Sequence, residues 1–212
     1  MDIPREDVSD LFRFFNPKLV SHKTHVQVVY SDAFDFKGNK EIICVLKFFH
    51  SKIKAAYDRE LAVYSAVASS KELQEIVPLK LWSGTWSRAQ YFDFLGKSLP
   101  SLLRRSDEEI LVIILPFIHH IGAISNSPED VHTFLVKAAL HSLRRLHAAH
   151  IAHGDISQSN LLIQRENDSG YYPYWIDFSL STVGSSTTEI SREWEKAVQY
   201  FSGLVYDCLC SL

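Results

Sequence analysis

The segment at residues 153–178, HGDISQSNLLIQRENDSGYYPYWIDF, constrains the fold more than any other part of this chain. It contains two short apolar runs, at residues 161–163 and 174–176, separated by a polar stretch at residues 166–170 that ends in a glycine. This pattern predicts two strands joined by a turn. Because a hairpin brings its two ends together, we expect Asp155 and Asn160, which precede the first strand, to lie near Asp177, which follows the second.

These three side chains have the chemistry that phosphoryl transfer requires. A carboxylate can orient an attacking hydroxyl group, while further oxygen ligands hold Mg²⁺ on the phosphates. Mg²⁺ binds hard oxygen donors and retains waters or phosphate oxygens in its remaining positions. The segment therefore predicts Asp155 as a catalytic base, and Asn160 and Asp177 as metal ligands.

The two motifs, HGD-x-x-x-x-N and I-D-F, resemble the signatures of the protein-kinase-like superfamily. The HGD form is similar to that of aminoglycoside and choline phosphotransferases, the small kinase of the KEOPS complex and small kinase-like proteins of fungi. The resemblance implies an α+β, two-lobed protein-kinase-like fold that uses ATP and Mg²⁺. It covers a small β-rich lobe followed by a helical lobe that carries the motifs.

In such a fold the small lobe supplies a lysine for the phosphates and a glutamate that holds it. Lys47 lies in the apolar run ICVLKFF, which resembles the V-A-I-K strand of kinases. Glu60 lies in YDRELAVY, early in the predicted helix that follows. A buried cation needs a partner, so we predict an ion pair between Lys47 and Glu60, although a surface lysine and a solvated glutamate are the simpler alternatives.

The resemblance also implies a hinge whose backbone binds adenine. We place it in the strand at residues 111–115 and the following residues 116–118, with Leu115 and Phe117 as binding residues. The alternative is YFDFLG at residues 91–96, which also looks like a hinge followed by a short helix.

The apolar pattern predicts an irregular or helical lead-in at residues 1–18, a small lobe at 19–118 and a large lobe at 119–212, divided near 119–127. We expect strands at residues 26–30, 43–49, 77–82, 91–95 and 110–118. We expect helices at residues 57–68, 132–150 and 190–208. The small lobe is then mainly β with one helix, and the large lobe mainly α with the hairpin.

The sequence departs from the protein-kinase pattern in four places. Residues 19–31 contain no glycine, so the glycine-rich phosphate loop is missing. Gly154 replaces the arginine that answers a phosphorylated activation loop, Ser157 stands in place of a lysine, and Ser179 in place of the D-F-G glycine. Since 35 residues follow Asp177 (212 − 177) without an A-P-E motif, we expect a shortened large lobe without activation-loop control.

Composition narrows the class of protein. The chain has 212 residues, 46% hydrophobic and 22% charged residues, and a net charge of −3, which are ordinary values for a globular protein. No basic cluster indicates nucleic acid or a membrane surface as a partner. The acidic N-terminus does not resemble a signal peptide, and three cysteines fit a reducing compartment. We therefore expect an intracellular protein, cytoplasmic or nuclear.

The resemblance predicts an ATP- and Mg²⁺-dependent phosphotransferase, a serine/threonine-protein kinase in its leading form, with a nucleotide and a protein hydroxyl acceptor as partners. The first alternative keeps the chemistry but has a small hydroxylated molecule as acceptor, as in aminoglycoside or choline kinases. The second is a pseudokinase that serves as a binding scaffold, which the missing glycine loop favours and the complete set of site residues opposes.

Overall fold

The computed structural model describes residues 12–23, 26–35, 40–95, 109–120, 129–166 and 170–209. These residues form helices, a five-stranded sheet and two small two-stranded sheets, so the chain is an α+β protein. The chain divides into two compact units. The first comprises residues 1–57 and 80–117, and the second residues 58–79 and 118–212, so that residues 58–79, which we expected in the small lobe, belong to the second unit.

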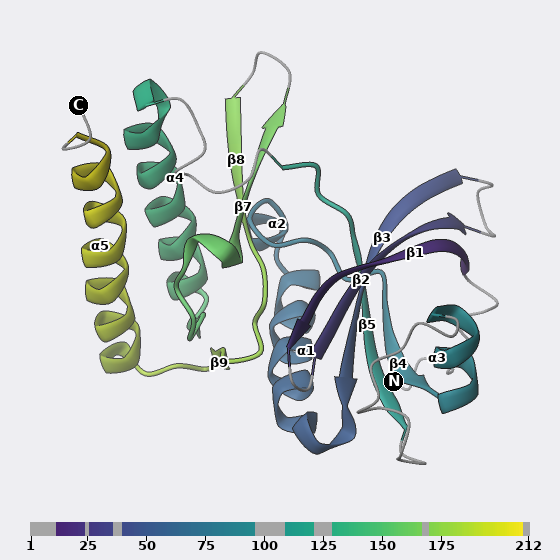
Figure 1. The fold of residues 1–212 in the computed structure, drawn as a ribbon. Coiled ribbons are helices and arrows are strands. Elements are labelled where there is room, and N and C mark those ends of the chain that lie inside the picture. Colours follow the sequence, from purple (N-terminus) through teal and green to yellow (C-terminus); the bar gives the residue numbers. More distant parts are fainter. Residues whose placement is uncertain are drawn as a thin grey trace. The chain divides into compact units, whose positions relative to one another are not determined.

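The first unit is built on an antiparallel sheet with the strand order β1-β2-β3-β5-β4 (Figure 1). β2 and β3 contain the strands predicted at residues 26–30 and 43–49, and they pair antiparallel from Val26–Phe49 to Asp35–Lys40. Residues 36–39 lie outside the described residues. β5 pairs with β3 on one side and β4 on the other. The strands are β1 (Phe12–Lys23), β2 (Val26–Asp35), β3 (Lys40–His50), β4 (Trp82–Trp86) and β5 (Ile110–Pro116).

The register gives this sheet two different faces. Lys47 is paired with Val28 and Ile113, so these three side chains share one face. The other face carries Leu46, Phe48 and their neighbours, and it is covered by the aromatic side chains of helix α3 (Arg88–Leu95). The first unit therefore has its aromatic core on the face opposite Lys47.

Helix α3 corrects two sequence predictions. Residues 91–95 were predicted as a strand, or alternatively as the hinge, because aromatic residues favour strands; they are helical instead. The helix turns Tyr91 and Phe94 onto Phe48, with ring centroids 4.9 and 5.9 Å away. The strand predicted at residues 77–82 begins only at Trp82.

The first part of strand β1 differs from the prediction, because the sequence indicates an irregular or helical lead-in at residues 1–18. The strand pairs with β2 from Phe12 onward, but its register shifts between Phe15 and Lys18. Asn16 and Pro17 occupy this shift. Proline cannot donate to a strand ladder, so a proline in the sequence argues against a strand. It is nevertheless tolerated in edge strands and bulges, as here. Residues 1–11 lie outside the described part of the chain.

The second unit contains most of helix α1 (Lys54–Ala68) and α2 (Lys71–Gln74), followed by α4 (Glu129–Ala148) and α5 (Thr187–Leu209). Between α4 and α5 the chain forms β6 (Ile151–Ala152), the 3₁₀ turn η5 (Gln158–Asn160), β7 (Leu161–Glu166), β8 (Gly170–Trp175) and β9 (Thr182–Val183). β7 and β8 are the predicted hairpin, paired from Leu161–Trp175 to Glu166–Gly170. β6 pairs with β9.

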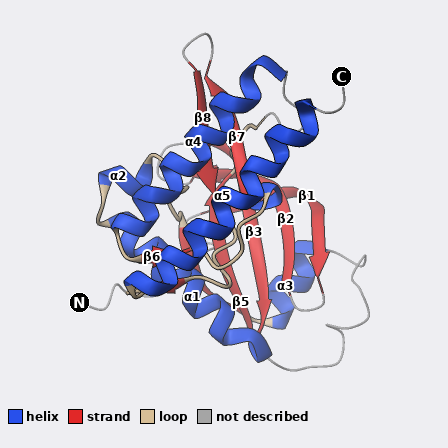
Figure 2. Cartoon of the chain, turned by 90° about the vertical axis from the view of Figure 1, so that its left-hand side faces the viewer, coloured by secondary structure: helices blue, strands red, loops and turns tan. Residues whose placement is uncertain are grey.

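Helices α4 and α5 lie side by side (Figure 2). They run in opposite directions: the carbonyl of His150, two residues after α4 ends, accepts hydrogen bonds from Gly184 and Ser185, just before α5 begins. Both helices match the predicted segments within a few residues. None of the helices in the described ranges has the length and apolar character needed to cross a membrane.

Candidate functional site

The β7–β8 hairpin brings the motif residues of the second unit together. Asn160 directly precedes β7, and its backbone carbonyl accepts a hydrogen bond from Ile176 N–H just after β8 (3.0 Å). The Asn160 amide group donates to the Asp155 backbone carbonyl and to Asp155 Oδ2, both at 2.9 Å. These two bonds hold Asn160 against Asp155, and the hairpin places Asp177 one residue beyond the bond between Ile176 and Asn160.

Asp177 adopts an unusual backbone conformation, with φ at 62°. A left-handed conformation is uncommon for residues other than glycine, although aspartate and asparagine are the most tolerant of it. Such conformations persist where the surrounding structure holds them in place. Here Ile176 on one side is bonded to Asn160, and Phe178 on the other side is completely buried.

His153 is the structural centre of this segment. Its ring lies between Trp175 and Phe178, with centroids 5.1 and 4.8 Å away. Its Nε2 lies 3.0 Å from the Ile176 carbonyl, and its Nδ1 accepts from Asp155 N–H at 3.3 Å. The carbonyl requires Nε2 to donate and the amide requires Nδ1 to accept, so the imidazole is neutral. His153 therefore supports the loop by packing and hydrogen bonding.

The electrostatic environment of His153 agrees with a neutral ring. Burial lowers the pKa of His153 below its ordinary value, against the opposing influence of the Glu193, Asp177 and Asp155 carboxylates. All three carboxylates act on this one ring, so it lies among the acidic groups of the segment.

Glu193 of helix α5 holds the start of the motif. Its Oε2 accepts from His153 N–H (2.9 Å) and lies 2.8 Å from His147 Nε2, while its Oε1 accepts from Gly154 N–H (2.5 Å). Burial raises the pKa of Glu193, but these hydrogen bonds outweigh burial and leave the pKa below its usual value. The carboxylate is therefore charged, and it fixes the two residues that precede Asp155.

Sequence reasoning missed Glu193, although the sequence contains a signal for it. The buried positions of α5 include Glu193, Ala197 and Phe201, spaced four residues apart on one face. A carboxylate in an otherwise apolar stripe indicates a buried partner. The more conspicuous apolar residues Trp194 and Val198 suggest a different buried stripe, but both are only half-buried.

Gly154 is required by the local geometry. Its φ is 84°, and a Cβ at this position would overlap the Leu180 carbonyl, 2.6 Å from the carbonyl carbon. No residue with a side chain fits here without moving the chain that follows Phe178. The glycine at this position therefore has a steric cause in this protein.

Phe178 links the motif to helix α1. Its ring lies 5.9 Å from that of Tyr64, whose hydroxyl donates to Glu60 Oε1 at 3.2 Å. Burial raises the pKa of Tyr64 well above its usual value, with further contributions from the Glu60 and Asp177 carboxylates. Arg59 Nε donates to the Ser179 carbonyl at 2.7 Å, so α1 also holds the chain after Asp177-Phe178. Glu60 is completely buried beside this contact.

Lys47 and residues 111–117 of the expected hinge belong to the first unit. Lys47 is buried on the sheet face opposite the aromatic core, with Nζ 5.5 Å from the Phe49 ring centroid. The predicted pair of Lys47 with Glu60 joins residues of different units and stays a prediction. Leu115 is buried and paired with Val45. Phe117 donates its backbone N–H to the Ile43 carbonyl (2.9 Å), so this N–H is already engaged within the first unit.

No protein-family model and no curated protein sequence matches this chain. The site is therefore interpreted from its own geometry and chemistry.

The residues of the motif fit a magnesium ion bound together with phosphates. Asn160 uses its amide nitrogen on Asp155, so its side-chain oxygen is the atom left to bind a cation. Asp177 would add a carboxylate oxygen. In the described part of the chain no three His, Cys, Asp or Glu side chains come close enough to form a metal centre by themselves. A site of two protein oxygens completed by waters and phosphates is the arrangement that Mg²⁺ favours.

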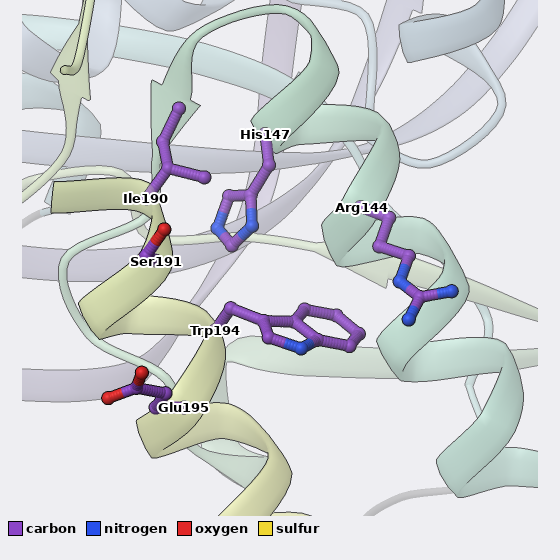
Figure 3. A pocket seen from close by; sticks show the side chains of 6 residues that line it. All are labelled: Arg144, His147, Ile190, Ser191, Trp194 and Glu195. Atoms are coloured by element: carbon purple, nitrogen blue, oxygen red, sulfur yellow. The ribbon is translucent and has the colours of Figure 1, made fainter. Parts of the chain in front are cut away.

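Helices α4 and α5 also line a pocket of about 380 Å³, which the sequence did not indicate (Figure 3). Arg144 lies over the Trp194 ring, with Cζ 4.4 Å from the ring centroid, and His147 lies edge-on to the same ring. His147 thus lines the pocket and also bonds Glu193, the carboxylate that holds the motif. The lining residues are Arg144, His147, Ile190, Ser191, Trp194 and Glu195.

Proposed function

We propose that this chain is an ATP- and Mg²⁺-dependent phosphotransferase with a two-lobed protein-kinase-like fold, acting on a Ser/Thr hydroxyl group of a protein. The observation that carries the proposal is the Asp155–Asn160 contact, held at the base of the β7–β8 hairpin beside Asp177. A scaffold protein has no physical need for a base and two cation ligands in this arrangement.

The proposed reaction transfers the γ-phosphoryl group to the acceptor. The acceptor oxygen attacks the γ-phosphorus, and the bond from that phosphorus to the β–γ bridging oxygen breaks, so that ADP leaves. Asp155 orients the acceptor hydroxyl and takes its proton. Since Asp155 Oδ2 accepts from Asn160, Oδ1 is the atom available for that proton.

The remaining residues bind and position the nucleotide. Asn160 and Asp177 would hold Mg²⁺, which neutralises charge on the phosphates. Lys47 would neutralise the α and β phosphates, with Glu60 as its partner, and the backbone near Leu115 and Phe117 would receive adenine. Most of the rate enhancement would come from positioning and electrostatic stabilisation.

Two features support the kinase-like fold. The first unit combines an antiparallel sheet with a lysine buried on one face of β3, and this face is opposite the aromatic core. The second unit contains a long helix, α4, that leads into the HGD motif and its hairpin. This order of elements is the one that the motif resemblance predicts.

The experiment measures thermal stabilisation by ATP, with and without Mg²⁺, and ATP turnover. It uses the wild type, Asp155→Ala, Asp177→Ala and, as a control, Asp93→Ala, whose exposed side chain lies in α3. We expect Mg²⁺-dependent stabilisation that is lost in Asp177→Ala and largely kept in Asp155→Ala, with turnover lost in both. The control should behave as the wild type. Binding of ATP without any dependence on Mg²⁺, together with no turnover, would contradict the proposal.

The same measurements distinguish the alternatives. A small-molecule kinase would give Mg²⁺-dependent stabilisation but phosphorylate a hydroxylated small molecule and no protein or peptide. A pseudokinase would give no turnover in the wild type. The absence of glycine from residues 19–31, in the first hairpin, is the feature that favours this last alternative.

A further inference from the structure

Helix α5 contacts the loop at residues 153–158, here called the catalytic loop, at two points, one on each side of Asp155. The Glu193 carboxylate accepts hydrogen bonds from the backbone N–H groups of His153 and Gly154, just before Asp155. The Tyr200 hydroxyl oxygen accepts a hydrogen bond from the backbone N–H of Gln158, three residues after Asp155, at 3.1 Å. The motif resemblance does not indicate the second contact.

The spacing of the two contacts follows from helix geometry. Tyr200 comes seven residues after Glu193 (200 − 193), which is close to two helical turns, so both side chains leave the same side of α5. Seven residues rise by about 10 Å along a helix. Ala197, between them, is completely buried, so this side of α5 packs against the body of the second unit. The helix thus holds both ends of the residues 153–158.

The two contacts differ in chemistry. Glu193 is buried and charged, and both of its carboxylate oxygens already have hydrogen-bond partners in the protein. Tyr200 is 37% exposed, and its oxygen only accepts the bond from Gln158. Its own hydroxyl proton has no acceptor in the part of the chain that the structure describes. The proton can therefore be donated to a group outside the protein, next to the loop that carries Asp155.

The loop residues beside Tyr200 are also polar. Ser157 and Ser159 lie on either side of Gln158, with their hydroxyl oxygens 2.8 Å apart. Ser157 stands where protein kinases usually have a lysine. Neutral hydroxyl groups therefore take the place of a fixed charge on this side of Asp155.

We propose that Tyr200 positions the catalytic loop through Gln158 N–H and donates its hydroxyl proton to the phosphate acceptor. The acceptor would carry an oxygen that can accept this bond near its reacting hydroxyl, as the backbone carbonyls of a peptide do. This inference rests on the proposed function, since it assigns the acceptor side of the same site.

The test compares Tyr200→Phe with Tyr172→Phe. Each substitution removes one exposed phenolic hydroxyl of the second unit, but Tyr172 lies in β8 and pairs with Gln164, away from the loop. Three quantities are measured in the full chain: amide hydrogen exchange of Gln158 by NMR, thermal stabilisation by Mg²⁺-ATP, and the kinetics of phosphate transfer to a degenerate Ser/Thr peptide library.

We expect Tyr200→Phe to speed exchange of the Gln158 amide about fivefold to tenfold, as loss of one hydrogen bond predicts. The KM for peptide should rise by a similar factor, while the KM for ATP and stabilisation by Mg²⁺-ATP stay unchanged. Tyr172→Phe should leave all three quantities as in the wild type.

Each other outcome overturns a defined part of the inference. Unchanged exchange at Gln158 overturns the loop contact. Faster exchange with an unchanged peptide KM overturns the role toward the acceptor, and an equal loss of ATP stabilisation indicates a general structural effect instead. Absence of transfer by the wild type, with ATP bound, overturns the proposed function and the acceptor role with it, whereas the exchange result still decides the loop contact.

Discussion

The two units hold their proposed functional residues by different means. In the second unit, residues 153–178 are fixed by hydrogen bonds, many of them to atoms within the same segment. Others go to α5, to Ser142 of α4 and to the Ile76 carbonyl. In the first unit, Lys47 lies on a strand whose position depends on apolar packing across five strands and α3. The proposed residues of the second unit are therefore held mainly by local hydrogen bonds, whereas the position of Lys47 in the first unit depends on a whole sheet.

The largest change in the free energy of unfolding is expected from a substitution in the apolar core of the first unit. Phe48→Ala removes a ring that is almost fully buried against Trp86, Tyr91 and Phe94. Deletion of a buried phenylalanine side chain lowers the free energy of unfolding by about 4 kcal/mol, because lost burial and a cavity add together. Urea unfolding followed by circular dichroism measures this.

Phe92→Ala is the matched control, since Phe92 belongs to the same cluster but is only partly buried. Its cost should be clearly smaller. Equal costs for the two substitutions would mean that packing around Phe48 does not hold the sheet.

Gly154→Ala tests the steric constraint in the hydrogen-bonded segment of the second unit. Both the positive φ and the overlap with the Leu180 carbonyl oppose a side chain, so we expect the free energy of unfolding to fall by about 3 kcal/mol. Gly184→Ala separates the two causes, because Gly184 has a φ of 79° but nothing within 4 Å of a Cβ. That variant should lose only about 1 kcal/mol, and a loss equal to that of Gly154→Ala would remove the steric explanation.

Glu193→Gln tests whether a charged carboxylate is needed to hold the loop. The amide group offers one acceptor oxygen where two are used, and it turns a donor toward a backbone N–H. We expect a loss of about 2 kcal/mol in the free energy of unfolding. Glu195→Gln, at an exposed position two residues further along α5, should change it by less than about 0.5 kcal/mol. The hydrogen-bond account fails if both substitutions are equally mild.

Acid should lower the free energy of unfolding through the protonation of His153 in the second unit. Its pKa is lowered in the folded state by burial, so below the unfolded pKa of about 6.5 the unfolded chain binds a proton that the folded chain does not. The stabilising contribution is thus present above that pH and decreases as the pH falls, by up to about 1.4 kcal/mol per pH unit. Below about 4.5, Glu193 adds a loss of the same sign, since its folded pKa is also lowered.

The check is urea unfolding at several values between pH 7 and pH 5 for the wild type and His153→Gln. The difference in the free energy of unfolding between them should shrink steadily as the pH falls. A constant difference across this range would show that the ring is not held neutral.

The sequence predicted the locally determined parts of the molecule well. The β7–β8 hairpin follows from two apolar runs and a polar turn within a single stretch of chain. Its pairing also brings Ile176, next to Asp177, onto Asn160. The three long helices follow from their apolar periodicity. In each case the interactions that decide the structure join residues close in sequence.

The failures have the opposite cause. YFDFL reads as a strand by propensity, but contacts with Phe48, distant in sequence, are made by a helix. Strand β1 exists because β2 pairs with it across a proline-containing bulge. Glu193 and Tyr200 acquire their roles from a loop some forty residues earlier in the chain, and nothing local to α5 identifies that partner.

The two contacts from α5 have a consequence for how this loop can vary. A helix does not stretch, so the separation of Glu193 and Tyr200 is set at about 10 Å. The loop that carries Asp155 must span that separation with a fixed number of residues between Gly154 and Gln158. Side chains within the loop can be exchanged without affecting this limit, but an inserted or deleted residue there would detach one end from the helix. In this protein the length of the loop is therefore more tightly restricted than its composition.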